Sequence, residues 1–173
     1  MENCVAIIKP RVLYAFIDKE TADKYEKHPR AAEPTLMLKH DAMSKMLDYA
    51  LDKYFGLNSN GKAIGRLDGG GGFYDGVYFS ISTVSRAVCV AVSTQKIGVD
   101  IVTPHDDDTV RSQCKLQALK KKHNLLFDHS KNIDDFESQD YAYHEDEFLN
   151  RLYVFAVTDA AEFIKTDIKT FLP

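Results

Sequence analysis

The chain has 173 residues, of which 45% are hydrophobic, and a formal net charge of −4 at pH 7. This length and hydrophobic content suit one compact globular unit and exclude a disordered protein. Because Lys and Arg are scattered among Asp and Glu, the chain lacks the basic field typical of nucleic-acid-binding proteins, and we expect no nucleic-acid partner.

The cysteines and the first residues set further bounds. The 3 cysteines are widely spaced and form no CxxC pair, so neither a disulfide framework nor a zinc site is indicated. The first apolar runs are interrupted by Lys9, Pro10 and Arg11, which is too broken for a signal peptide or a membrane span. We therefore expect a cytoplasmic protein with no membrane partner.

The first third of the chain combines strand and helix patterns. Residues 5–8 and 12–17 predict two strands separated by Pro10, and a polar stretch follows. Apolar residues then recur at intervals of three and four over residues 43–55, which predicts an amphipathic helix ended by Gly56 in a left-handed conformation.

Residues 58–76 predict a loop, in which the run 69–72 consists of glycine and favours a mobile connection over a phosphate-binding loop. Three strands are predicted after it: an alternating one from Val77, an apolar one over 87–92, and one that contains Asp100. An ionised carboxylate inside an apolar strand is costly unless a cation is paired with it. We therefore expect Asp100 to hold a metal, with an ion pair near the strand end as the alternative.

The last third predicts helices. Residues 109–124 have a helical pattern with a basic cluster at 120–122, and an acidic, polar loop follows. Apolar residues at helical spacing predict a final helix over about residues 145–165, with Asp159 at the margin of its apolar stripe.

The segment from Val77 to Val102 resembles the first signature of the phosphopantetheinyl transferases. That signature has an apolar residue, Asn and Ile or Leu before Ser-His-Ser, then an apolar strand, then Gly-Val-Asp-Ile-Glu. FSISTVS, AVCVAVS and IGVDIV occupy these places in the same order and at nearly the same spacing. Upstream, Lys62 stands at the lysine of a Gly-Lys-Pro stretch, and Lys45 stands on a helix that carries a phosphate-binding basic residue in the family.

A second signature is more weakly matched. FAVTDAAEFIK resembles the family's aromatic residue followed by Thr, any residue, Lys, Glu, Ala and a later Lys. In this alignment Thr158 and Asp159 take the Lys-Glu positions, and Lys165 lies two residues beyond the final lysine.

The resemblance implies an α+β fold in which an antiparallel sheet packs against a long helix. It implies one compact unit made of a first lobe over residues 1–102, with the coenzyme A-binding elements, and a second, truncated lobe over 103–173 with the late helix. The two-lobed family members have a further strand pair at this end, so we expect an open sheet edge that favours a homo-oligomer.

The implied activity is Mg²⁺-dependent transfer of phosphopantetheine from coenzyme A to a serine of an acyl or peptidyl carrier protein. Asp100 and Asp159 are the expected Mg²⁺ ligands and catalytic carboxylates, and Glu162, one helical turn beyond Asp159, is the spare catalytic base. The residues expected to hold the phosphates of coenzyme A are Lys39, Lys45, Lys62, Ser82, Thr83 and Lys165.

Three positions depart from the family pattern. Thr83 replaces the histidine, Val102 replaces the glutamate after Asp100, and Thr158 replaces the lysine of the second signature. These replacements leave three readings open: a working holo-carrier-protein synthase, a degenerate relative that binds coenzyme A or a carrier protein without transfer, or an unrelated α+β protein with a chance Gly-Val-Asp-Ile strand.

Overall fold

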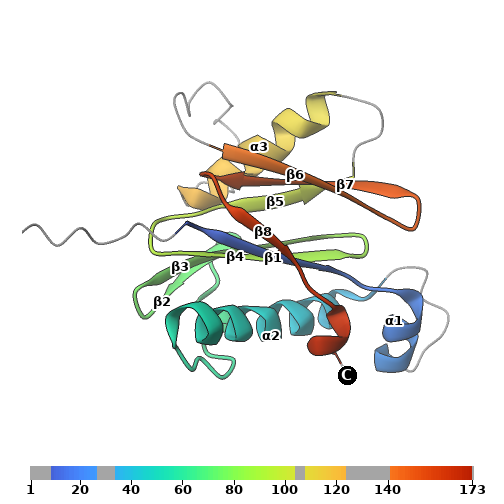
Figure 1. Ribbon diagram of the computed structural model, residues 1–173, viewed down its shortest axis with the longest axis horizontal. Helices are drawn as coiled ribbons and strands as arrows, with labels where there is room; N and C mark the ends of the chain where they lie inside the picture. Colours follow the sequence, from blue (N-terminus) through green and yellow to red (C-terminus); the bar gives the residue numbers. More distant parts are fainter. Residues whose placement is uncertain (1–8, 27–33, 104–107, 124–140, 173) are drawn as a thin grey trace, which may run out of the picture.

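The computed structural model describes residues 9–26, 34–103, 108–123 and 141–172. Two sheets lie face to face, with one long helix outside each of them, so the layers run α2, large sheet, small sheet, α3 (Figure 1). The expected mixed α+β class is confirmed.

The large sheet has five strands and the small sheet has three. The order of the large sheet is β2 (Gly71–Tyr74), β3 (Val77–Val84), β4 (Ala87–Ser93), β1 (Arg11–Phe16) and β8 (Glu162–Lys165). The order of the small sheet is β5 (Val99–Val102), β7 (Arg151–Thr158) and β6 (Tyr141–Phe148). The strand pairs are antiparallel except for β1 with β8, which is parallel. Among the described residues, the helices are α1 (Lys19–Glu26), α2 (Leu36–Phe55) and α3 (Asp108–Lys122), with the short 3-10 turns η1 (Ile64–Arg66) and η3 (Ile168–Thr170).

The long helix α2 lies on the large sheet and confirms the helix predicted over 43–55. It begins earlier than predicted, because the Thr35 hydroxyl caps it by accepting a hydrogen bond from the backbone N–H of Leu38 at 3.2 Å. It ends where predicted, with Gly56 at φ 65° and its N–H donating to the carbonyl of Asp52 at 2.9 Å.

Strands β1 and β4 form the centre of the molecule, and both are buried on their two faces. On β1, Leu13 and Ala15 face the core under α2, while Val12, Tyr14 and Phe16 face the core between the sheets. Cys89 of β4 lies in this inter-sheet core and is fully buried, as predicted for a small core residue. The predicted strands at residues 12–17, 77 onward, 87–92 and around Asp100 are confirmed, whereas residues 5–8 lie outside the described part.

The helix predicted over 145–165 is wrong, because this segment forms β6, β7 and β8. Leu149 and Asn150 join β6 to β7 with φ angles of 50° and 61°, the left-handed pair of a two-residue hairpin turn. The apolar residues that suggested one helical stripe therefore come from separate strands. As a result, Asp159 and Glu162 are not neighbours on a helix face.

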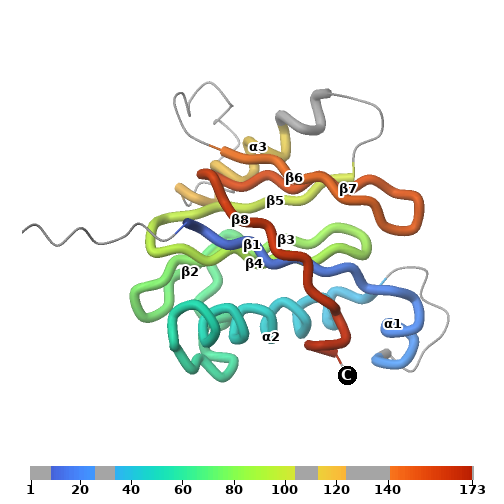
Figure 2. Tube along the Cα trace, viewed as in Figure 1, coloured from blue at the N-terminus to red at the C-terminus, as the bar shows by residue number. Residues whose placement is uncertain are grey.

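The tube trace shows the same four layers and the late strands running back across the molecule (Figure 2). Strand β5 ends at Val102, the last residue of the first lobe expected from the sequence, yet it pairs with β7 from the second. The small sheet therefore joins the two parts of the chain.

The glycine run is ordered by close packing. Part of the segment predicted as a loop forms β2, and a Cβ on Gly70 would lie 2.7 Å from Cε of Lys121. At the start of the Gly-Val-Asp-Ile motif, a Cβ on Gly98 would overlap the carbonyl oxygen of Ala118 on α3. Gly98 is needed because the backbones of β5 and α3 approach closely there, whereas Gly70 has a φ of 84° and makes room for the Lys121 side chain.

Candidate functional site

Asp100 lies on β5, on the face of the small sheet that packs against α3. Its neighbours Val99 and Ile101 point into the core between the sheets, so the alternation of the strand directs Asp100 to the opposite side. The Asp100 side chain is 16% exposed.

Two side chains bind the Asp100 carboxylate. The Ser82 hydroxyl of β3 donates to Oδ1 at 3.0 Å, and Nζ of Lys121 on α3 lies 3.3 Å from the same oxygen. The cation that offsets the buried charge is thus an ammonium of the chain itself. This arrangement corresponds to the ion-pair alternative for Asp100.

Three hydrogen-bond acceptors hold the Lys121 ammonium in this position. Its Nζ also donates to the carbonyl of Ile81 at 3.1 Å and to that of Val99 at 3.0 Å, and the side chain is 9% exposed. An ammonium has three protons, so these contacts use all of its donors. The basic cluster at 120–122 is visible in the sequence, but this role of Lys121 was not predicted, although Cys114, Ala118 and Lys121 share one helix face by their spacing.

The serines of β3 tie the two sheets together. Ser80 Oγ accepts a hydrogen bond from the N–H of Val99 at 3.1 Å, and Ser82 Oγ accepts one from the N–H of Ile101 at 3.3 Å. Both serines are buried. Ser82 was expected to hold a phosphate. Its hydroxyl instead accepts a hydrogen bond from a backbone N–H of the edge strand β5.

Asp159 lies away from Asp100. It occupies the turn after β7 with φ 77°, and its carboxylate is 3.8 Å from Nζ of Lys122. Asp100 pairs with Ala156 inside the small sheet, whereas Asp159 lies beyond the end of β7. Each acid has its own lysine, and the structure does not bring them together.

Glu162 is also remote from Asp100. It begins β8, on the far side of β1 and β4 from β3, and its carboxylate lies 3.7 Å from Nε of Arg11. Within the described residues, no three His, Cys, Asp or Glu side chains lie together as a metal site. To share a Mg²⁺ ion, Asp100 and Asp159 would each have to give up the lysine with which it is paired.

The residues expected to bind coenzyme A are spread over several elements. Lys39 of α2 donates to the carbonyl of Ser85 at 3.2 Å, and the Thr83 hydroxyl donates to that of Ala87 at 2.8 Å. Lys165 on β8 pairs with Asp146 at 3.1 Å. Each of these three side chains bonds to a different part of the chain.

Of the residues expected to bind coenzyme A, Lys45 and Lys62 lie on two segments that contact each other. Lys45 lies on α2, 47% exposed and 3.7 Å from Asp41. The loop that carries Lys62 is fastened to the same helix by the N–H of Gly61, which donates to Asp48 at 2.8 Å. Asp48 is one helical turn from Lys45, so the exposed loop that carries Lys62 is fastened to α2 within one turn of Lys45.

A second polar cluster, which the sequence analysis missed, lies between the sheets. The Tyr14 hydroxyl contacts Oδ2 of Asp146 and Nε2 of His144, each at 2.9 Å, and Lys165 completes the cluster through Asp146. Tyr14 has one proton, which it gives to the carboxylate, so Nε2 of His144 must carry a proton and donate to the tyrosine oxygen. The residues come from β1, β6 and β8, which hides the cluster from sequence inspection.

This cluster shifts the pKa of two of its members. Burial, together with the hydrogen bond to Asp146, raises the pKa of Tyr14 above its usual value. Burial opposes ionisation of Asp146, but hydrogen bonds from Lys165 and Tyr14 outweigh it and hold the pKa of the carboxyl below its usual value.

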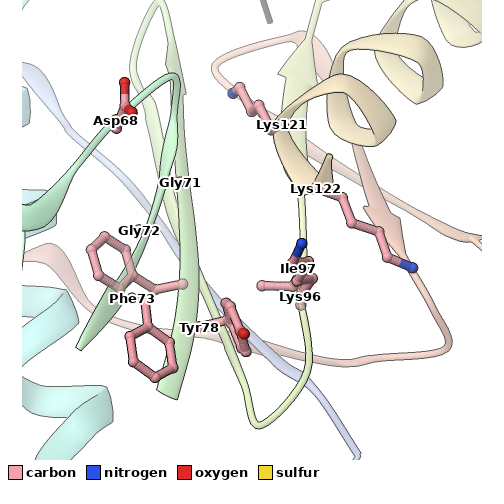
Figure 3. Close-up of a pocket in the computed structure, with 10 residues that line it drawn as sticks. Asp68, Gly71, Gly72, Phe73, Tyr78, Lys96, Ile97, Lys121 and Lys122 are labelled. Atoms are coloured by element: carbon pink, nitrogen blue, oxygen red, sulfur yellow. The ribbon is translucent and has the colours of Figure 1, made fainter. Parts of the chain in front are cut away.

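A cavity of about 260 Å³ opens between the β2–β3 hairpin, the β4–β5 loop and the end of α3 (Figure 3). Its lining combines the rings of Phe73 and Tyr78 with Lys96 and the end of α3. Lys121, whose ammonium binds Asp100, lines the cavity with its side chain. The cavity therefore lies beside the Asp100 ion pair.

In comparisons with known proteins, no family model and no curated protein matches the chain. Of the helices that the structure describes, none is long and apolar enough to cross a membrane.

Proposed function

We propose that this chain is a degenerate relative of the phosphopantetheinyl transferases that binds coenzyme A without requiring Mg²⁺. The resemblance of FSISTVS, AVCVAVS and IGVDIV to the first signature of that family supports the ligand class. The loss of Mg²⁺ dependence is supported by the Lys121 ammonium on Asp100 and by the separate lysine on Asp159.

The single observation that carries the proposal is the position of Lys121. A Mg²⁺ ion bound by Asp100 needs carboxylate oxygens that no internal cation holds, and it uses one or two such carboxylates together with substrate oxygens. Lys121 is held at Asp100 by two backbone carbonyls as well as by the carboxylate. Displacing it would leave a buried ammonium without its acid.

Lys45 and Lys62 are the residues that we assign to the phosphates of coenzyme A. Lys45 lies on α2 with its side chain half-exposed, and the loop that carries Lys62 is fastened to the same helix through Gly61 and Asp48. Ammonium groups bind phosphate oxygens as point charges, so neither lysine needs a metal to do this.

Titration calorimetry of coenzyme A with and without Mg²⁺ tests this proposal. We expect equal affinities in both conditions, and weaker binding in the variant Lys45→Gln/Lys62→Gln than in the matched variant Lys24→Gln, whose lysine is exposed on α1. Absence of coenzyme A binding, or binding only with Mg²⁺, would contradict the proposal.

The second candidate is Mg²⁺-dependent transfer of phosphopantetheine to a carrier-protein serine. The placement of Asp100 beside Ser82 in the resembling segment favours it. Mass spectrometry of an acyl or peptidyl carrier protein after incubation with the chain, coenzyme A and Mg²⁺ separates the two candidates. The binding proposal expects no mass gain, whereas a gain of one phosphopantetheine group would establish the transferase.

A further inference from the structure

Two hairpin turns, one from each sheet, meet at one end of the molecule. The β3–β4 turn consists of residues 85 and 86 and the β6–β7 turn of residues 149 and 150, and both lie at the same end of the two sheets (Figure 1). Nη1 of Arg151, the first residue of β7, donates to Oγ of Ser85 at 2.9 Å. This contact joins the turns, although the two residues are 66 positions apart in the chain.

A cavity of about 150 Å³ lies where the two turns meet. Its charged groups are the guanidinium groups of Arg86 and Arg151, and in the part of the chain that the structure describes no Asp or Glu lines it. Its apolar wall consists of Phe148, Leu149 and Tyr153. The lining therefore suits an anion that has an apolar body.

A third cation lies next to the cavity. Nζ of Lys39 on α2 donates at 3.2 Å to the carbonyl of Ser85, which lines the cavity. The Asp18 carboxylate interacts electrostatically with Arg86, but it lines a neighbouring cavity. The side chain of Arg151 uses one of the five N–H groups of a guanidinium on Ser85 and keeps the others for a ligand.

We propose that this cavity binds a small carboxylate with an apolar body, of the size of an arylcarboxylate. The two oxygens of the carboxylate match the forked donors of the Arg151 guanidinium. The ring packs on Phe148 and Leu149, and because Leu149 is 66% exposed, the ligand covers apolar surface that water now contacts. Ordinary small-molecule pockets hold roughly 300–1,000 Å³, so this smaller cavity limits the ligand to a single ring with its carboxylate.

This ligand class differs from that of the proposed function. Coenzyme A carries phosphates, amides and a thiol but no carboxylate, and it is much larger than this cavity. Its phosphates are assigned to Lys45 and Lys62, neither of which lines the cavity. The inference therefore depends on the two turns alone.

Titration followed by NMR, with benzoate as the probe, tests this inference. We expect wild type to bind benzoate, and Arg151→Gln to bind it about tenfold more weakly, because a charge-assisted pair is lost. The matched control is Arg66→Gln, which removes an exposed arginine of η1 and should bind like wild type. Arg151 is also exposed, and circular dichroism checks that both variants fold. No benzoate binding by wild type, or equal binding by Arg151→Gln and Arg66→Gln, would overturn the inference.

Further probes separate the charge from the ring. Benzamide has the ring of benzoate without its charge and should bind about tenfold more weakly. Acetate has the charge without the ring, so Leu149→Asn should weaken benzoate binding about threefold and leave acetate binding unchanged. Benzamide binding as tight as that of benzoate, or tighter binding of inorganic phosphate than of benzoate, would overturn the assignment of an apolar carboxylate.

Coenzyme A distinguishes this inference from the proposed function. Saturating coenzyme A should leave benzoate binding unchanged, and displacement of benzoate would overturn the inference by placing coenzyme A in the cavity. Benzoate binding without coenzyme A binding contradicts only the proposed function, whereas coenzyme A binding without benzoate binding contradicts only this inference.

Discussion

At the scale of the residue, the central feature is the cation on Asp100. The sequence shows a carboxylate in an apolar strand, and electrostatics requires a counter-charge for it. Lys121 supplies that charge from α3, 21 positions along the chain. A metal and a lysine satisfy the same requirement, so sequence reasoning identified the need but not which cation meets it.

Removing one partner of this pair should cost more than removing both. Lys121→Met leaves the Asp100 carboxylate buried without a cation, and we expect a loss of about 3 kcal/mol in the free energy of unfolding. Adding Asp100→Asn removes the unpaired charge and should recover at least half of that loss. Urea unfolding of the two single variants and the double variant measures the coupling.

The control for this cycle is Lys122→Met, whose lysine pairs with Asp159 at the longer distance of 3.8 Å. This change should cost less than Lys121→Met. Strictly additive losses for Lys121→Met and Asp100→Asn would show that the two side chains are not coupled.

At the scale of the element, regular patterns were predicted well and the last segment was not. The helix α2 and strands β1, β3, β4 and β5 lie where their sequence patterns predict them, and the apolar run of β4 is buried throughout. The segment 145–165 has apolar residues at helical spacing as well as many β-branched and aromatic residues. Its pairing with β5 and β1 decides in favour of strands, and that pairing is not local in sequence.

The β6–β7 turn offers a test of that assignment. Leu149 is 66% exposed, and both turn residues have positive φ, which Asn and Gly adopt most readily. The variant Leu149→Asn/Asn150→Gly should therefore raise the free energy of unfolding by about 0.5–1 kcal/mol. In a helix the same glycine would lower it by about 1 kcal/mol, so thermal and urea unfolding distinguish the two structures.

At the scale of the whole molecule, two sheets and two outer helices are joined through polar contacts as well as through apolar cores. Ser80 and Ser82 connect β3 to β5 on one side. On another side, Tyr14, Asp146 and Lys165 connect β1, β6 and β8. These contacts fix the small sheet on the large one.

The Asp146 cluster should make global stability depend on acid. The pKa of Asp146 is lower in the folded protein than its value of 3.8 in the unfolded chain, so its contribution is present above that value and is lost as the pH falls below it. Unfolding free energies measured between about pH 6 and pH 3 should fall less steeply for Asp146→Asn than for wild type. Identical slopes would mean that Asp146 is not linked to folding.

The sequence by itself determined the α+β class, the long helix α2 and the central strands, because these follow from local periodicity. It also showed that Asp100 needs a cation beside it, because burying an unpaired carboxylate is costly. Tertiary structure alone decided the rest: that β6, β7 and β8 replace a helix, that Asp100 and Asp159 lie apart with separate lysines, and that Tyr14 meets Asp146. Each of these depends on contacts between residues far apart in the chain, whose geometry is set by how the two sheets pack.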